Sequence, residues 1–326
     1  MRIVNITHND LDGIACGVLM TVYAKQHNIG DIEIRHCSYQ EVNEVALQEL
    51  QKATNQSEPT MLYITDISVD DETATLLDKA NNAYAGQFRA ILIDHHQTAE
   101  RLNKYEWAYV SELNDEGKLT SGTELLAQHL WKSYSVAKNF INDVTLYDSW
   151  RWTTECSPPY MQSKYLNDYV KLLGKKKATE LYVDRILCGR PVLEDGEVTM
   201  MELSYLKTKR IAFVKGNSMI RKKLVVTPKD GSQPCHVLQV GFIFCENDIS
   251  TVCAEILNNH PDVDLIISTS MPTYMSYRTS KDLPIPLGEV ASRIAGGGGH
   301  PKAAGSNVNM EFINKVLDTK TDTISI

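Results

Sequence analysis

The residues best suited to chemistry lie near the start of the chain, where His8, Asp10 and Asp12 occupy alternate positions after the apolar run 3–6. In extended backbone, residues at i, i+2 and i+4 point to one side, so these three side chains are expected to converge. Gly13 then permits close approach of the backbone where a helix begins. A single aspartate after a strand often caps a helix, but three converging groups of these types are typical of a metal site.

Two later segments end in similar groups. One β-rich run ends in Asp66, and the apolar run 90–93 leads into Asp94, His95 and His96. Because the carboxyl ends of parallel strands share one edge of an α/β sheet, we expect these groups to meet the first cluster there. Neighbouring side chains on a strand point to opposite faces, so one histidine can bind metal while the other faces substrate. Carboxylates gathered this closely repel one another without cations, and the sequence therefore predicts a site for two metal ions.

The ligand types indicate which metal would bind. Carboxylate and imidazole without cysteine favour Mn²⁺, with Co²⁺, Fe²⁺ or Zn²⁺ as alternatives. Two such ions about 3.5–4 Å apart can share one carboxylate, generate hydroxide and stabilise an in-line displacement at phosphorus. A later acidic residue is needed to complete the ligands, and the segment 142–150 offers two. Asp148, which lies among aromatic residues, is the preferred ligand. Asp143 can instead be explained as a solvent-facing carboxylate on a helix.

A second candidate site combines a glycine run, Gly297, Gly298 and Gly299, with the His300 that follows it. Glycines leave backbone N–H groups free to surround a phosphate, although a flexible loop is the plain alternative. Arg278, on an expected neighbouring strand, supplies a bidentate fork for phosphate. His300 is a candidate to hold or protonate a phosphate oxygen.

Elements that could position these groups alternate along the first half of the chain. Strands are expected at 2–7, 32–35, 60–65 and 89–93, and helices at 13–26, 41–53 and 70–83. This alternation implies βαβ units and a parallel sheet. Helices are then expected at 120–134, where Ser121 and Glu124 form a capping signal, and at 137–149, before an almost wholly helical region over 160–220.

Strands return in the last third of the chain. They are expected at 236–244, 263–269 and 274–279, with helices at 288–294 and 309–317. We therefore predict an α/β protein of two domains, the first (1–190) with a parallel sheet covered by helices on both faces. A helical linker over 191–220 would lead into the second, smaller α/β domain over 221–326.

Composition narrows the class of protein. The 326 residues are 43% hydrophobic and 23% charged, which is ordinary for a soluble globular protein. The sequence has neither an apolar stretch long enough to span a membrane nor a signal-peptide pattern, so a cytoplasmic location is expected. Seven scattered cysteines without a C-x-x-C pair are expected to be reduced. The net charge of -8 argues against a general binder of long duplex nucleic acid, but it allows a small anionic substrate held through metals.

Taken together, five separated motifs resemble the DHH phosphoesterase superfamily, including its DHH-associated C-terminal domain, DHHA1. The matching stretches are 7–13, 64–67, 93–96, 147–152 and 296–300. They occur in the expected order and cover essentially the whole chain. Within the superfamily, the chain is most similar to the nanoRNase B type of oligoribonuclease. The resemblance implies a DHH catalytic domain over 1–190 and a DHHA1 substrate-binding domain over 221–326.

The resemblance also implies roles for the motif residues. It implies two metal ions that are bridged by Asp66. The other implied ligands are His8 and Asp10 for one ion, and Asp12, His95 and Asp148 for the other. His96 would lie beyond the metals towards the substrate, and Asp94 would either bind metal or orient a histidine. Arg278 and the glycine run that ends in His300 match the phosphate-binding part of the second domain.

The implied activity is metal-dependent hydrolysis of very short RNA from the 3′ end to nucleoside 5′-monophosphates. The same ligands would also serve a phosphodiesterase for cyclic or linear dinucleotides, or a phosphatase for 3′-phosphoadenosine-5′-phosphate. A third alternative is a nucleotide-binding sensor without catalysis. The expected partners are short RNA oligonucleotides or dinucleotides rather than membranes or long duplexes, and both a monomer and a homodimer stay open.

Overall fold

The chain folds into two compact units, Met1–Met201 and Glu202–Ile326, each with its own sheet. A computed structural model describes residues 1–56, 58–131, 137–152, 161–227 and 235–326. The helix α9 (Asp195–Asn217) contains the division between the units. This helix falls within the expected linker 191–220, whose limits as a domain boundary stay a prediction.

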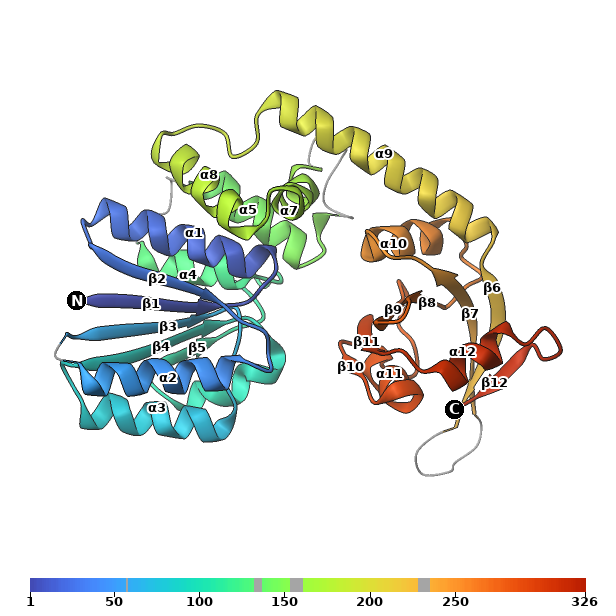
Figure 1. The fold of residues 1–326 in the computed structure, drawn as a ribbon, viewed down its shortest axis with the longest axis horizontal. Helices are drawn as coiled ribbons and strands as arrows, with labels where there is room; N and C mark the ends of the chain where they lie inside the picture. Colours follow the sequence, from blue (N-terminus) through green and yellow to red (C-terminus); the bar gives the residue numbers. More distant parts are fainter. Residues whose placement is uncertain (57, 132–136, 153–160, 228–234) are drawn as a thin grey trace. The chain divides into compact units, whose positions relative to one another are not determined.

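The first unit is built on a five-stranded sheet in the order β2-β1-β3-β4-β5, with every neighbouring pair parallel (Figure 1). The strands are β1 (Arg2–Thr7), β2 (Asp31–His36), β3 (Thr60–Thr65), β4 (Phe88–Asp94) and β5 (Ala108–Val110). The sequence pattern predicted the first four. It missed β5, because three residues are too few to show alternation. Parallel pairing places all carboxyl ends at one edge of the sheet.

Helices cover both faces of this sheet, as predicted. The helices of this unit are α1 (Leu11–Gln26), α2 (Val42–Asn55), α3 (Asp71–Ala83), α4 (Gly122–Leu130), α5 (Lys138–Asp148), α7 (Gln162–Leu173), α8 (Lys175–Leu187) and a 3-10 helix, Gln97–Lys104. Figure 1 shows α1 and α4 on one face and α2 and α3 on the other. The last residues of the helix expected over 120–134 lie outside the described residues, and α4 ends at Leu130.

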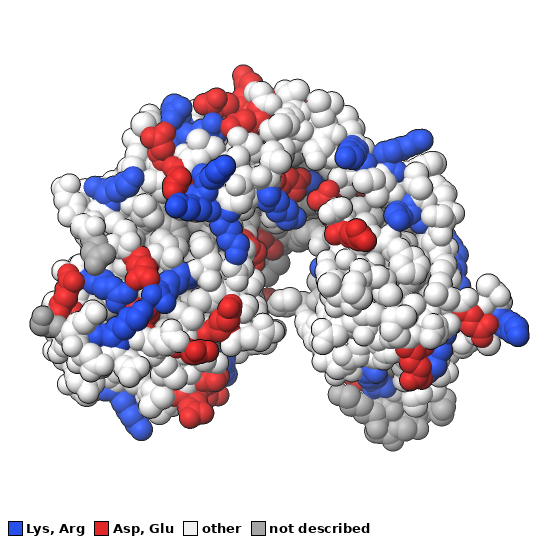
Figure 2. All heavy atoms as spheres, in the orientation of Figure 1, with Lys and Arg blue, Asp and Glu red and all other residues white. Residues whose placement is uncertain are grey.

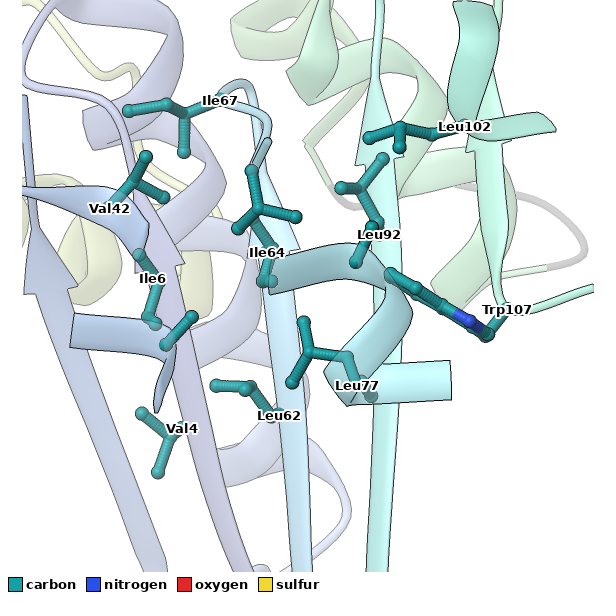
Figure 3. Close-up of a cluster of buried hydrophobic side chains, with 14 of the residues drawn as sticks. Val4, Ile6, Val42, Leu62, Ile64, Ile67, Leu77, Leu92, Leu102 and Trp107 are labelled. Carbon is teal, nitrogen blue, oxygen red and sulfur yellow. The ribbon is translucent and has the colours of Figure 1, made fainter. Parts of the chain in front are cut away.

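Apolar side chains fill the space between the sheet and the layer of α2 and α3 (Figure 3). Ile64 of β3, Leu92 of β4 and Leu77 of α3 are fully buried in this cluster. Trp107 extends the cluster, and its indole N–H donates to Asp78 Oδ1 at 3.1 Å. Each such aliphatic side chain contributes about 1.5–3 kcal/mol by leaving water. This packing stabilises the sheet, which in turn holds the loops at its carboxyl edge in position.

The second unit has a seven-stranded mixed sheet in the order β10-β11-β9-β8-β7-β6-β12. Its strands are β6 (Ile220–Val226), β7 (His236–Phe244), β8 (Leu265–Ser270), β9 (Tyr274–Arg278), β10 (Gly298–Gly299), β11 (Ala303–Asn307) and β12 (Thr323–Ser325). Its helices, after α9, are α10 (Ile249–Asn259), α11 (Leu287–Ala295) and α12 (Met310–Leu317). The three strands and two helices expected in this region are confirmed to within two residues. The expected smaller second α/β domain is also confirmed.

The second sheet is buried on both faces. Leu265 and Ile267 face one core with α11 and α12, and Ile266 faces the other core with α10 and Ala212 of α9. This alternation follows from the two-residue period of a strand. The sequence missed β11, Ala303–Asn307, because its small and polar residues become a strand only by pairing with β9.

Three expectations from composition can be compared with the structure. No helix of the described residues is long and apolar enough to cross a membrane. Six cysteines are free thiols, while Cys156 lies outside the described residues. Figure 2 shows Lys and Arg side chains interspersed with Asp and Glu over the first unit, without one broad positive surface on the described part of that face.

Candidate metal centre

The carboxyl edge of the first sheet brings the predicted residues together. Thr7 at the end of β1 lies beside Thr65 at the end of β3, and β4 runs alongside β3 in the same direction. His8, Asp66 and Asp94 therefore come at the ends of three adjacent strands. Parallel pairing thus joins three motifs that are far apart in the sequence.

Three groups of side chains at this edge could each hold a metal ion, because each offers ligand atoms within 4.8 Å of one another. The groups are His8, Asp10 and Asp66; Asp12, His95 and Asp148; and Asp66, Asp94, His95 and His96. Every residue predicted for the site in the first unit belongs to at least one group. Asp143 belongs to none of them. The division of ligands between two ions stays a prediction.

Asp66 occupies the centre of these groups. Its backbone has φ of 56°, in the left-handed region that residues other than glycine seldom adopt. The side chain is 1% exposed, and its two carboxylate oxygens have no hydrogen-bond partner in the described part of the chain. Because burial of an unpartnered carboxylate is strongly unfavourable, a metal cation fits this position as the missing partner.

His95 lies close to three carboxylates at this edge. Its Nε2 atom lies 3.3 Å from Asp66 Oδ1, 3.3 Å from Asp148 Oδ2 and 3.8 Å from Asp12 Oδ2. This nitrogen is also buried without a hydrogen-bond partner among the residues described. One imidazole nitrogen thus faces three carboxylates from different parts of the fold. This donor set suits Mn²⁺ and related divalent ions.

Electrostatics at the site point the same way. Burial, followed by the negative charges of Asp12 and Asp10, raises the pKa of Asp66 well above its usual value. Burial and the charge of Asp12 likewise raise the pKa of Asp148. Burial opposes ionisation of Asp10 too, but its hydrogen bond and ion pair with His8 lower its pKa to about 2. A divalent cation would keep all these carboxylates ionised, because its charge would offset both the cost of burying them and the repulsion between them.

Asp12 is held by the N-terminus of α4. Its Oδ2 atom accepts from Gly122 N at 2.6 Å, and its Oδ1 atom accepts from Thr123 N at 2.9 Å. The positive end of the helix dipole stabilises a carboxylate in this position. Ser121 caps the helix by accepting from Glu124 N at 3.2 Å, which confirms the predicted capping signal. The connection from this cap to Asp12 was not predicted.

Two glycines allow the backbone to pass close to the site. A Cβ atom at Gly122 would lie 2.7 Å from Asp66 Cβ, and one at Gly13 would lie 2.3 Å from His8 O. Gly13 N also donates to Asp10 Oδ1 at 3.1 Å, so Asp10 caps α1 as well as facing the site. The close approach predicted at Gly13 is confirmed. Gly122 was missed because its partners lie far earlier in the sequence.

Asp94 is fully buried and surrounded by donors from the protein. Its Oδ1 atom accepts from His95 N at 2.8 Å and bonds His96 Nδ1 at 2.8 Å, and its Oδ2 atom accepts from the Ser68 hydroxyl. Of the two roles left open for Asp94, this arrangement favours orientation of His96. Burial lowers the pKa of His96, but the hydrogen bond to Asp94 and the negative charges of Asp94, Asp10 and Asp12 together raise that pKa overall.

The sequence pattern did not identify two residues at or just after the carboxyl end of β2. Tyr39 is three residues beyond this strand, and its hydroxyl lies 3.2 Å from His96 Nε2. Its ring centroid is 5.0 Å from that of His8. His36, the last residue of β2, bonds His8 O through Nδ1 at 3.0 Å. The available signal was position, because β2 ends at the same edge as the other parallel strands.

The glycine run of the second unit is ordered by pairing. Gly298 and Gly299 form β10 against β11. The N–H of Gly297 donates to Ala291 O at 3.2 Å, and the N–H of His300 donates to Ala303 O at 2.8 Å. Two of the N–H groups expected to face a phosphate therefore bond within the protein. Phosphate binding by this run stays a prediction.

Arg278 ends β9 and pairs opposite Ala303 of β11, so it lies on a strand near the glycine run as expected. Its Nη1 atom donates to Tyr277 O at 2.8 Å and to Ala304 O at 3.1 Å, and Nη2 donates to Ser250 Oγ at 3.4 Å. These bonds hold the guanidinium against the sheet. A fixed guanidinium is suited to an anion, and that role stays a prediction.

Comparison with known proteins adds an independent finding. No protein-family model matches the chain. The chain is 31% identical over 312 residues to Oligoribonuclease NrnB from Bacillus subtilis (strain 168), a match that covers 94% of this chain and 72% of that protein. An uncharacterized protein from Helicobacter pylori G27 aligns with a TM-score of 0.46 and 15% identity over 97% of both chains. An exopolyphosphatase-related protein from Bacteroides fragilis aligns with a TM-score of 0.46 and 13% identity, over 97% of this chain and 90% of that one.

The two structural likenesses are distant and have no bearing on the assignment. The sequence match covers 94% of this chain, so it spans both units. The motifs and the long sequence match lead to one family. The chain belongs to the family of the oligoribonuclease NrnB, within the DHH phosphoesterase superfamily.

Proposed function

We propose that this chain is a two-metal, Mn²⁺-dependent phosphodiesterase that degrades very short RNA from the 3′ end to nucleoside 5′-monophosphates. The observation that carries the proposal is the buried carboxylate of Asp66, which has no hydrogen-bond partner among the described residues and faces His95 Nε2 at 3.3 Å. The name of the B. subtilis relative, an oligoribonuclease, supports RNA as the substrate.

The proposed ligands follow from the groups at the carboxyl edge. Asp66 would bridge the two ions. The remaining ligands would be His8 and Asp10 for one ion, and Asp12, His95 and Asp148 for the other. When bound, the ions would supply a hydroxide nucleophile at neutral pH and neutralise charge at the phosphorus. The carboxylates and imidazoles would hold the ions at one edge of a rigid sheet, where substrate can reach them.

His96 and Asp94 have different proposed roles. Asp94 bonds His96 Nδ1, so the opposite ring nitrogen of His96 is directed away from that carboxylate. We expect the His96 ring to lie beyond the metals, on the side that faces the substrate. In the second unit, Arg278 and the glycine run that ends in His300 would hold a phosphate of the nucleotide. The fixed guanidinium of Arg278 supports that assignment.

The first test is a substrate panel with purified protein and Mn²⁺. The panel contains an RNA dimer, an RNA pentamer, a 24-mer, cyclic di-adenylate and 3′-phosphoadenosine-5′-phosphate. The control is the double variant Asp12→Ala, His95→Ala, and products are separated by chromatography. Rapid hydrolysis of the dimer and pentamer to 5′-monophosphates is expected. Products that carry a 3′-phosphate would contradict the proposed cleavage of the P–O3′ bond.

The same panel separates the alternative functions. Faster turnover of cyclic di-adenylate or of 3′-phosphoadenosine-5′-phosphate would assign the site to those nucleotides, with the metal chemistry retained. Tight nucleotide binding without turnover, in protein shown to contain Mn²⁺, would assign a sensor. The match to an oligoribonuclease over 94% of this chain favours the short-RNA activity over both.

A further inference from the structure

Tyr39 lies between an exposed surface and the candidate metal site. We call this site, formed by the three groups of side chains at the carboxyl edge of the first sheet, the metal edge. It lies in the segment between β2 and α2, three residues after His36. Its hydroxyl is 3.2 Å from His96 Nε2, and its ring is tilted against His8 with centroids 5.0 Å apart. The rings of Tyr39 and His96 meet edge to face at 6.1 Å. One aromatic side chain thus contacts two of the residues proposed for the site.

The hydroxyl of Tyr39 completes a chain of hydrogen bonds. Ser68 donates to Asp94, Asp94 bonds His96 Nδ1 at 2.8 Å, and Tyr39 reaches the other nitrogen of the same ring. Asp94 is an acceptor, so Nδ1 of His96 is the donor in that bond, and Nε2 can accept from the phenol. Contacts at both nitrogens restrict rotation and flipping of the imidazole. Tyr39 is therefore placed to set the orientation of His96.

The ring of Tyr39 is also an open aromatic surface. The residue is 52% exposed, whereas Asp66 at the centre of the site is 1% exposed. The segment that carries Tyr39 is held on both sides, because Cys37 N donates to Thr7 O at 2.8 Å and Ser38 Oγ donates to Glu41 Oε2 at 2.6 Å. An anchored, uncharged ring beside carboxylates suits the flat face of a nucleobase rather than a second phosphate.

We propose that Tyr39 positions the substrate: its hydroxyl orients His96, and its exposed face stacks on the base of a nucleotide next to the scissile phosphate. This inference rests on the proposed function, because it requires a nucleotide substrate at the metal edge. The two parts of the side chain make separable contributions. The hydroxyl acts through His96 on turnover, and the ring acts on substrate affinity.

Two variants separate these contributions. Tyr39→Phe keeps the ring and removes the hydroxyl, so kcat falls about tenfold on every substrate with little change in KM. Tyr39→Leu also removes the ring, and it raises KM for an adenylate dimer at least about tenfold. Tyr84→Leu is the matched control. Tyr84 is 43% exposed just before β4 begins, at the opposite edge of the sheet.

The decisive comparison uses dimers that lack one base. If Tyr39 stacks on a base, Tyr39→Leu raises KM for the complete dimer but leaves KM unchanged for the dimer that lacks that base. Equal losses on the complete dimer and on both abasic dimers would overturn the stacking role. Loss of bound Mn²⁺ in Tyr39→Leu would overturn it as well, because Tyr39 would then support His8 rather than the substrate.

A binding measurement keeps this inference separate from the proposed activity. An RNA dimer with 2-aminopurine in place of one base loses fluorescence when that base stacks on an aromatic ring. With the 2-aminopurine at the stacked position, we expect quenching with the wild-type protein and Tyr84→Leu, but not with Tyr39→Leu. Quenching without turnover would contradict the proposed function and retain only the stacking role of the Tyr39 ring. Equal quenching by all three proteins, with 2-aminopurine at either position, would overturn that role.

Discussion

The carboxylate of Asp66 and the Nε2 atom of His95 lie 3.3 Å apart, and both are buried without a hydrogen-bond partner among the described residues. Each group would be unfavourable in that position by itself, because no hydrogen-bond partner among the described residues compensates its burial. A divalent cation between them satisfies both at once. This pair therefore links the stability of the sheet edge to metal binding, and it leads to the first prediction.

Asp66→Asn separates metal binding from folding. Burial and neighbouring carboxylates raise the pKa of Asp66, so its ionised form destabilises the metal-free protein at neutral pH. The asparagine variant should have a higher Tm than wild type in EDTA. It should also lose the rise in Tm that Mn²⁺ produces in wild type, and nearly all turnover. A variant that still gains Tm with Mn²⁺ would show that Asp66 does not bind the metal.

Gly122→Ala should weaken metal binding without removing any ligand. The added Cβ would lie 2.7 Å from Asp66 Cβ and 3.1 Å from Asp12 Oδ2, so one of these must shift. We expect Mn²⁺ affinity to fall about tenfold or more, as for other changes that disturb ligand orientation, measured by calorimetric titration. Gly30→Ala is the control, because a Cβ there meets nothing within 4 Å. Equal Mn²⁺ affinity in the two variants would show that a Cβ at position 122 does not disturb Asp66 or Asp12.

Asp94→Asn tests the two roles left open for Asp94. The side chain accepts from Ser68 and bonds His96, so an amide in its place would disturb the orientation of that ring. We expect kcat to fall about 10- to 100-fold while the Mn²⁺ content stays at the wild-type level. Metal analysis by mass spectrometry together with steady-state kinetics is the measurement. Loss of one ion per chain would instead identify Asp94 as a ligand.

Asp143→Asn should stabilise the protein in a pH-dependent way. Burial raises the pKa of Asp143 to about 6, above the value near 3.9 of an unfolded chain. Stability from this group is therefore present at low pH and is lost as pH rises from about 4 to about 6. The variant should exceed wild type by about 1–2 kcal/mol at pH 7.5 and match it near pH 4, in urea unfolding. Turnover should be retained, in contrast to Asp148→Asn.

An absence of any stability difference at pH 7.5 would show that Asp143 is well solvated. A loss of turnover in Asp143→Asn would overturn the choice of Asp148 over Asp143 as the later acidic residue. The structure supports that choice, because Asp148 Oδ2 lies 3.3 Å from His95 Nε2 and Asp143 joins none of the three groups of candidate ligands.

The sequence alone determined the main framework and which residues meet at the carboxyl edge of the first sheet. Apolar runs such as 3–6 and 90–93 predicted strands, because a buried parallel strand must be apolar on both faces. Parallel strands end at one edge, so the positions of His8, Asp66 and Asp94 at strand ends were enough to predict that they meet. These inferences depend on local pattern and on a general rule of α/β sheets, and both can be read without coordinates.

Only the tertiary structure decided what surrounds that edge. Gly122 is 110 residues from Asp12, which accepts its N–H, and Tyr39 is 57 residues from His96. Neither contact can be read from the periodicity of the sequence, because each joins two segments that are distant in the sequence. The tertiary structure also favours an orienting role for Asp94, because the Ser68 hydroxyl and a backbone N–H donate to its side chain. Local burial sets strand and helix patterns, whereas these side-chain partners are set by packing between segments distant in the sequence.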